Sequence, residues 1–411
     1  MEEEEEEAEG EGEEMDFRQV LTNQSQRDEN EASINTYQKE ELVIEEEKFH
    51  PFGNNLELES NLESEIEGWD YELKERGILT DALPIRTGCF NGEYMAIGTN
   101  SKNLKIWNIS KFISEIENKN VPKNLEFLPE GETRKNIVEE IPVIFNQLNH
   151  HEGSIYCLDW TTCERLIASG SNDKNIKILV CPPLNEIDEG EESDNLLELT
   201  LVGHQAIVRT LCFHPQDELN LISGGEADSS LKIWNTETGA NILSLEGHQN
   251  GIFSIKPTFD GSFFTSVGKD KNLKIWDLRI KKWVFSMDCS EFGETTWVSL
   301  NSEVFNLPSK IAAVSHSSGA VSLWDLNMRK WVNDVKAHER EARSVSFSYD
   351  GKYLASGGFD STVKILDLMK EWEIVQTLNH SNKVISVKWH SQHPILLSTS
   401  ADKSAKIWTP S

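Results

Sequence analysis

The sequence predicts an all-β fold, a propeller of seven four-stranded sheets that follows a disordered acidic tail. Three observations predict it. A short segment with one pattern recurs seven times at the spacing of propeller blades. The better copies are preceded by a run in which apolar and polar residues alternate, as they do in half-buried strands. Acidic residues are concentrated before the first copy.

The first 68 residues carry most of the negative charge. They contain 24 acidic and 4 basic side chains, a local net charge of -20 out of -31 for all 411 residues. The run Glu2–Glu7 is the extreme case. Because so charged a segment buries too little apolar surface to offset its chain entropy, we expect residues 1–68 to form a disordered tail. Residues 69–411 are then the folded domain.

The recurring segment has a small-residue strand, an Asp in a tight turn, and a second strand that ends in Trp or Leu. Its last residue falls at positions 107, 179, 234, 276, 324, 366 and 408. Successive copies are therefore 72, 55, 42, 48, 42 and 42 residues apart, against about 40 to 45 for one blade. Seven copies predict seven blades. The first and fifth have Ser101 and Ser318 in place of the Asp, so we expect packing to hold these two blades.

The last blade needs an outer strand from elsewhere in the chain. Only three residues follow Trp408, and a propeller has to cover the edge of its last sheet. The stretch Tyr71–Thr80 stands just before the first copy. We expect residues 69–83 to supply the missing strand and close the ring. The extra length of the first two copies, 110–140 and 181–195, falls between the third and fourth strands of their blades.

The repeat resembles the WD-repeat family. A His precedes the alternating run in five copies, twice as a Gly-His pair. The resemblance implies a structural network in which the turn Asp bonds this His, the His bonds a Ser, and the Ser reaches a Trp indole. The implied networks are His151, Ser169 and Asp173; His204, Ser223, Asp228 and Trp234; His248, Ser266, Asp270 and Trp276; His338, Ser356 and Asp360; and His380, Ser398, Asp402 and Trp408.

A catalytic interpretation of these residues is disfavoured. A catalytic triad would occur once, beside an oxyanion site, whereas this grouping recurs blade after blade. The sequence has no P-loop, dinucleotide fingerprint, HExxH motif or nucleophile elbow. The six cysteines form no CxxC pair, and the nearby Cys212 and His214 suit core packing better than a metal site. We therefore expect a non-enzyme without cofactor, metal or small-molecule substrate.

The rim of the central channel is the expected interaction surface. In the family that this chain resembles, the residue before each turn Asp and the residues that open each inner strand lie there. The matching positions are Asn172, Lys269, Phe359 and Ala401, then Tyr156, Arg209, Phe253, Arg343 and Lys383, with Trp297 from the fifth copy. A ring of aromatic and basic residues suits a peptide with acidic and apolar anchors. Ordinary strand packing is the alternative for each residue alone.

Three runs, 96–107, 150–179 and 387–408, resemble the C-terminal propeller of nemitin-type WD-repeat proteins, which are microtubule-associated. This resemblance implies a cytoplasmic protein scaffold of the cytoskeleton or cilium, with cytoskeletal or axonemal proteins as partners within a larger complex. Tubulin's exposed surface is acidic and would repel the tail. We therefore expect docking through an intermediary, or by the propeller with the tail pointing away, and not through residues 1–68.

Two alternatives stay open. The first is a chromatin or histone-binding propeller whose acidic tail screens basic partners. The second is a substrate receptor of a cullin-type ubiquitin ligase, because the run from Trp276 to Arg279 resembles the WDxR box. A nucleic-acid partner is not expected, since residues 69–411 carry a net charge of -11. No apolar stretch approaches the roughly 18 to 20 residues that span a membrane, so none is expected to enter one.

Overall fold

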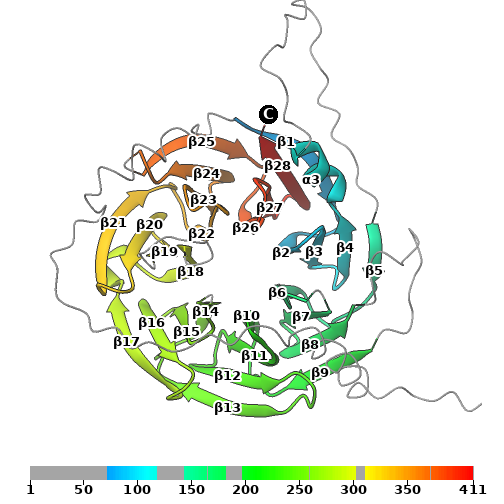
Figure 1. Cartoon of the computed structure of the whole chain (residues 1–411), viewed down its shortest axis with the longest axis vertical. Coiled ribbons are helices and arrows are strands. Elements are labelled where there is room, and N and C mark those ends of the chain that lie inside the picture. Colours follow the sequence, from blue (N-terminus) through cyan, green and yellow to red (C-terminus); the bar gives the residue numbers. More distant parts are fainter. Residues whose placement is uncertain are drawn as a thin grey trace, which may run out of the picture. The chain divides into compact units, whose positions relative to one another are not determined.

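The computed structural model describes residues 72–117, 143–163, 165–181, 197–258, 260–301, 311–370 and 372–410. The predicted tail, 1–68, lies outside these ranges, as do most of the two insertions. The described chain forms seven four-stranded antiparallel sheets around a central channel (Figure 1). The prediction of a seven-bladed propeller is confirmed.

Each sheet is one blade. In six blades the strands follow in chain order from the channel outward, and in the seventh three such strands are followed by the first described strand of the chain as the outermost one. The strands of blades one to three are β2 (Ile85–Asn91), β3 (Tyr94–Thr99), β4 (Leu104–Asn108), β5 (Val143–Gln147); β6 (Ile155–Trp160), β7 (Leu166–Ser171), β8 (Asn175–Val180), β9 (Glu198–Val202); β10 (Val208–His214), β11 (Asp217–Gly225), β12 (Ser230–Asn235) and β13 (Asn241–Glu246). Those of blades four to six are β14 (Ile252–Pro257), β15 (Phe263–Gly268), β16 (Asn272–Asp277), β17 (Lys282–Asp288); β18 (Thr295–Leu300), β19 (Ile311–His316), β20 (Ala320–Asp325), β21 (Lys330–Lys336); β22 (Ala342–Phe347), β23 (Tyr353–Gly358), β24 (Thr362–Asp367) and β25 (Glu373–Asn379). Blade seven contains β26 (Val384–Trp389), β27 (Leu396–Ser400), β28 (Ser404–Pro410) and β1 (Leu73–Thr80).

The core lies in the seams between neighbouring blades. The second strand of each blade is buried on both faces: every residue of β3 and β7 is buried. One apolar cluster joins Val267 and Leu273 of blade four to Val298 and Val314 of blade five. Burial of this kind stabilises by about 25 cal/mol for each Å² of apolar surface removed from water. Outer strands bury less, and β17 and β21 each expose their first three residues.

The structure places the chain's first described strand in the last blade. β1 pairs antiparallel with β28, with Leu73 opposite Pro410 and Thr80 opposite Ser404. Gln376 of β25 accepts a hydrogen bond from the Leu73 N–H at 3.0 Å and donates one to the Leu73 carbonyl at 2.9 Å. β1 therefore contacts blade six as well as β28 of blade seven.

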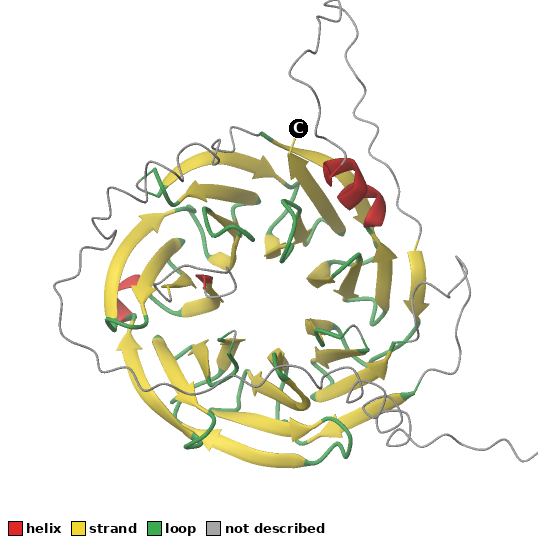
Figure 2. Cartoon of the chain, in the orientation of Figure 1, coloured by secondary structure: helices red, strands yellow, loops and turns green. Residues whose placement is uncertain are grey.

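Helix α3 (Ser110–Glu117) and the 3₁₀ turn η2 (Ser290–Phe292) are the helical elements of the described ranges (Figure 2). Phe112 and Ile113 of α3 belong to the same buried cluster as Leu79 of β1 and Ile407 of β28. The start of the first insertion therefore packs on the junction that closes the ring.

A candidate docking site at the channel mouth

Three blades carry the complete four-residue network. In blade four, His248 Nδ1 lies 2.9 Å from Asp270 Oδ2, and its Nε2 lies 2.6 Å from Ser266 Oγ. Trp276 Nε1 donates to the same Oγ at 2.7 Å. Blades three and seven repeat the arrangement with His204, Ser223, Asp228 and Trp234, and with His380, Ser398, Asp402 and Trp408. Each network joins an outer loop to the blade's inner strands, and its Ser is fully buried, as a structural role requires.

In blades two and six, Leu179 and Leu366 stand where the Trp would be, so Ser169 and Ser356 lack an indole donor. His151 and His338 keep their contacts to Ser and Asp. In blade two a second histidine takes the indole's place: His150 Nε2 lies 2.7 Å from Ser169 Oγ, and its Nδ1 lies 2.9 Å from Glu198 Oε2. Burial lowers the pKa of His150 despite the Glu198 carboxylate. The sequence pattern did not single out this residue.

Blade five, which is expected to be held mainly by packing, also contains a hydrogen-bonded network. His316 Nε2 lies 2.6 Å from Ser322 Oγ, and Trp324 Nε1 donates to the same oxygen at 2.7 Å. A His–Ser–Trp network is therefore rebuilt from different sequence positions, without an Asp. In blade one the Trp107 indole N–H finds no acceptor among the described residues, and the Lys105–Asp81 ion pair (2.7 Å) is the charged contact there.

Replacing His316 by Gln should reduce the acid sensitivity of the fold. Burial lowers the pKa of His316 to about 3, below the ordinary value of about 6.5. Between these two pH values the unfolded chain binds more protons, so stability falls as the pH falls from about 6.5 towards 3. At pH 5 this residue alone should account for about 2 kcal/mol. Denaturant melts at pH 7 and pH 5 should show a smaller difference for His316→Gln; an unchanged difference contradicts this reading.

In every blade, the second residue of the innermost strand is a β-bulge. At this point the pairing register with the second strand shifts by one residue, which leaves one residue without a cross-strand partner. Bulges commonly re-aim a side chain. The bulged residues are Arg86, Tyr156, Arg209, Phe253, Thr296, Arg343 and Ile385.

Six of these seven residues line one cavity of about 420 Å³ at the channel mouth. Thr296 is the exception, because its hydroxyl is held by Ser315 and the Ala342 carbonyl. Of the residues that the sequence predicts for the rim, the cavity brings together Tyr156, Arg209, Phe253, Trp297, Arg343, Phe359, Lys383 and Ala401. Lys269 and Asn172 are exposed but do not line it. The sequence analysis missed Arg86, Asn100, Glu341 and Ile385; the shared bulge position identifies Arg86 and Ile385.

Cations and aromatic rings alternate along this wall. The guanidinium of Arg86 lies 4.3 Å from the centre of the Tyr156 ring. Arg209 lies 5.1 Å from Tyr156 and 5.2 Å from Phe253, and Arg343 lies 5.9 Å from Phe253. Each such contact stabilises by roughly 0.5 to 2 kcal/mol and fixes the orientation of the cation. On the other side Lys383 lies 4.8 Å from the Phe359 ring.

Arg209 is a largely buried cation without an ion pair among the described residues, although Glu226 attracts its charge from further away. Burial lowers the pKa of its guanidinium to about 10, and the neighbouring Arg343 acts in the same direction. Arg343 has Glu341 at 3.0 Å, whereas no carboxylate of the described residues lies within ion-pair distance of Arg209. Arg209 still carries its charge at neutral pH. Four cations and one carboxylate therefore line a cavity in a chain whose overall charge is strongly negative.

The other candidate residues have structural partners. His214 donates from Nε2 to the Gly261 carbonyl at 3.1 Å and accepts from the Gln216 N–H at Nδ1, while Cys212 is buried. The described residues contain no group of three or more potential metal ligands. In the run that resembles a WDxR box, Arg279 is held by both oxygens of Asp277, at 3.0 and 2.7 Å. No helix in the described ranges has the length and apolar character needed to cross a bilayer.

Comparison with known proteins identifies the repeat. The family model described as WD domain, G-beta repeat matches residues 143–178, 196–235, 239–277, 329–367 and 372–409. Each matched stretch joins the outermost strand of one blade to three strands of the next. The copies that carry Ser101 and Ser318 lie outside the matched stretches.

Several relatives are similar over part of their length. A LEC14B protein of Lithospermum erythrorhizon is 27% identical over 62% of this chain and 50% of its own length. A nuclear distribution protein PAC1 of Arthroderma benhamiae is 27% identical over 54% and 52%. A coronin-like protein of Saccharomyces cerevisiae is 34% identical over 29% and 19%. The matches thus span about half, or less, of these relatives. The crystal structure of the WD40 propeller domain of Doa1 shares the fold, with a TM-score of 0.60, 18% identity, and coverage of 82% of this chain and 97% of that one.

Proposed function

Because this chain is a WD-repeat propeller, we propose that it is a non-catalytic scaffold that holds an acidic segment of a partner protein at its channel mouth. WD-repeat propellers generally bind proteins. The observation that carries the proposal is the Arg209 guanidinium, which lies between two aromatic rings in a cavity and forms no ion pair with the described residues.

A carboxylate is the group that this cavity best accommodates. A guanidinium presents paired N–H donors that match the two oxygens of a carboxylate, and charge-assisted bonds of this kind are about twice as strong as neutral ones. Arg86 and Arg343 flank Arg209 through the shared Tyr156 and Phe253 rings. The aromatic faces, with Trp297 and Phe359, offer contact area for apolar side chains beside the acid.

For the partner we favour a cytoskeletal or axonemal protein. This part of the proposal is supported by the resemblance of runs 96–107, 150–179 and 387–408 to nemitin-type propellers. The resemblance implies a scaffold of the cytoskeleton or axoneme, and the cations of the channel mouth favour an acidic segment of such a partner. Relatives named for nuclear distribution are compatible with such a role but cover only part of their own length.

The two alternatives fit the channel mouth less well. A lysine-rich histone segment would meet the charges of Arg86, Arg209, Arg343 and Lys383, so a basic partner would have to bind elsewhere. For a ligase receptor of the WDxR type, Arg279 remains 67% exposed while Asp277 holds its guanidinium from both oxygens, and no other described feature points to an adaptor. Salt separates the cases: docking at the partly buried mouth should persist from low to physiological salt, whereas binding driven by residues 1–68 should fade.

Replacing Arg209 by Met should abolish most partner binding. Met keeps the length and packing of the side chain but removes the charge that meets the carboxylate. We expect partner affinity to fall at least tenfold, or about 1.4 kcal/mol. The test captures partners on the tagged full chain, identifies them by mass spectrometry, and measures their affinity by calorimetry.

Arg165→Met is the matched control, because it removes the same charge from a residue of blade two that does not line the cavity. Equal affinity of the partner for the Arg209→Met and Arg165→Met chains would refute the proposal. Capture of histones that release at physiological salt, or of a cullin adaptor, would favour one of the alternatives.

A further inference from the structure

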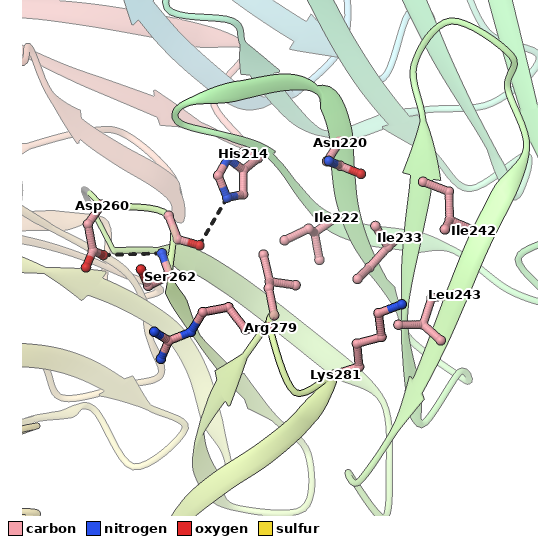
Figure 3. A pocket seen from close by; sticks show the side chains of 12 residues that line it. His214, Asn220, Ile222, Ile233, Ile242, Leu243, Asp260, Ser262, Arg279 and Lys281 are labelled. Atoms are coloured by element: carbon pink, nitrogen blue, oxygen red, sulfur yellow. Dashed lines mark hydrogen bonds between the residues drawn. The ribbon is translucent and has the colours of Figure 1, made fainter. Parts of the chain in front are cut away.

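A second concave site lies in the seam between blades three and four. It has a volume of about 440 Å³ (Figure 3). Its apolar floor is formed by side chains of β11, β12 and β13 in blade three and of the β16–β17 turn in blade four, and polar side chains surround this floor. The floor residues are Ile222, Ile233, Leu243 and Leu278. The polar residues are His214, Asn220, Asp260, Ser262, Arg279 and Lys281.

This seam groove opens on the face of the propeller opposite the channel mouth. The mouth is built where each innermost strand begins, as at Ile85 and Ala342. The groove is built where the innermost strands end, at His214 and the turn after Pro257, and at the β16–β17 turn. The start and the end of a strand lie on opposite faces of the propeller. In an antiparallel sheet, the end of the innermost strand lies on the same face as the turn that joins the third and fourth strands.

The wall nearest His214 is preformed. The His214 ring donates to the Gly261 carbonyl, which joins blade three to blade four. Gly261 has a φ of +66°, and a Cβ at this position would collide with the His214 ring. A glycine is therefore required here by both its backbone conformation and its contact. The groove keeps its shape through this link without a bound partner.

The neighbouring seam shows what fills such a space. Between blades four and five, the guanidinium of Arg329 lies 4.8 Å from the centre of the Phe285 ring. The strand registers make Lys281 the counterpart of Arg329. Lys281 precedes Lys282, which pairs with Asp277 in blade four, and Arg329 precedes Lys330, which pairs with Asp325 in blade five. The two residues also share a positive φ, 57° and 53°. By the same registers Leu243 of blade three is the counterpart of Phe285.

Blades three and four therefore lack the aromatic ring that the next seam has. In place of Phe285 and Arg329 stand the smaller Leu243 and the flexible Lys281, and here the groove is found. Ile242, which lines the groove, is 53% exposed and adds apolar surface to its wall. The missing ring indicates that a planar aromatic side chain would fit the groove.

The charges around the groove favour an acidic partner. Lys281 and its neighbour Lys282 are exposed, and no carboxylate of the described residues lies within ion-pair distance of either. The nearby acids are already engaged: Asp277 by Arg279, and Asp260 by the Thr258 hydroxyl and the Ser262 N–H. The exposed Lys281 thus lines an apolar groove, and the exposed Lys282 follows it in the chain.

We propose that the seam groove is a second docking site, which takes one aromatic side chain of an acidic protein segment. The ring lies on Ile222, Ile233 and Leu243, where Phe285 would lie in the next seam. Carboxylates beside it in the partner's sequence pair with Lys281 and Lys282. This site is separate from the channel mouth and does not depend on the function proposed for it.

The test uses a short fluorescein-labelled peptide with one central phenylalanine between glutamates. Binding is measured by anisotropy on the full chain carrying Arg209→Met, which silences the channel mouth. Adding Leu243→Phe with Lys281→Arg copies the filled seam into the open one, and should weaken binding at least about tenfold. Lys281→Gly is a second variant, because glycine tolerates the positive φ and the fold is retained while the charge is lost.

Several outcomes would overturn the proposal. Unchanged affinity after the seam substitutions places the peptide elsewhere. Equal binding of peptides with serine for phenylalanine, or glutamine for glutamate, contradicts the stated chemistry, as does failure of the original peptide to bind. A chain that sediments as a dimer, and becomes monomeric on Leu243→Phe with Lys281→Arg, would make a second copy the occupant instead. Loss of binding only on Arg209→Met in the otherwise native chain would assign the peptide to the mouth.

Discussion

Deleting residues 1–82 should unfold the propeller, whereas deleting residues 1–60 should leave its melting temperature nearly unchanged. The longer deletion removes β1, which pairs with β28 along its length and buries Leu73 and Leu79. It exposes the edge of β28 and the surface on which α3 packs. A folded domain of this kind is stable by only about 5 to 15 kcal/mol, so loss of a whole strand and its seam contacts should remove most of that.

The measurement is the melting temperature of both truncated chains, monitored by circular dichroism during heating. A milder variant guards against loss of expression: Leu79→Ala should cost about 2 to 4 kcal/mol, because Leu79 is buried in the closing cluster. Equal melting temperatures for the two truncations would show that the ring does not depend on β1.

Replacing Ser266 by Ala should destabilise the propeller by about 2 to 4 kcal/mol. The Ser266 hydroxyl bonds both His248 Nε2 and Trp276 Nε1 inside blade four. Its removal leaves two buried polar groups without partners, each at a cost of about 1 to 3 kcal/mol. The change in volume is small, so the loss comes mainly from the hydrogen bonds.

Ser254→Ala is the matched control for this substitution. Ser254 and Ser266 are both fully buried in blade four, but the Ser254 hydroxyl has no partner among the described residues. Its replacement should therefore be neutral or slightly stabilising. Urea unfolding of the two variants decides the matter: equal destabilisation would mean that the network around Ser266 contributes nothing beyond packing.

The repeat in the sequence predicted the blades well because each blade carries its own copy of the same local constraints. The turn Asp, the His and the Ser are fixed by one sheet's geometry, so their spacing within a copy is enough to identify them. The closing strand was predicted on a different ground, because a propeller must cover the edge of its last sheet, and β1 lies at that edge beside β28.

The remaining features depend on contacts between blades or on substitutions outside the repeat pattern. His150 replaces a missing indole by contacting Ser169, with Glu198 of β9 at its other ring nitrogen, and His316 rebuilds a network from shifted positions. Arg86 faces the channel only because its strand has a bulge that the register reveals. The seam groove joins Leu243 and Lys281, which belong to different blades, so no single copy of the repeat contains it.

The channel mouth and the seam groove give the propeller two surfaces that suit acidic partners, on opposite faces. In each, cations stand beside apolar or aromatic contact area, although the whole chain is strongly acidic. A scaffold with this arrangement holds two acidic segments at once. Each segment meets a local cluster of positive charge, although the net charge of the whole chain is negative.

The most direct test is the structure of the full chain bound to the partner that it captures. Docking at the channel mouth predicts a partner carboxylate within ion-pair distance of Arg209, with partner side chains against Tyr156 and Phe253. A partner bound only to other surfaces, with water alone around the Arg209 guanidinium, would contradict it.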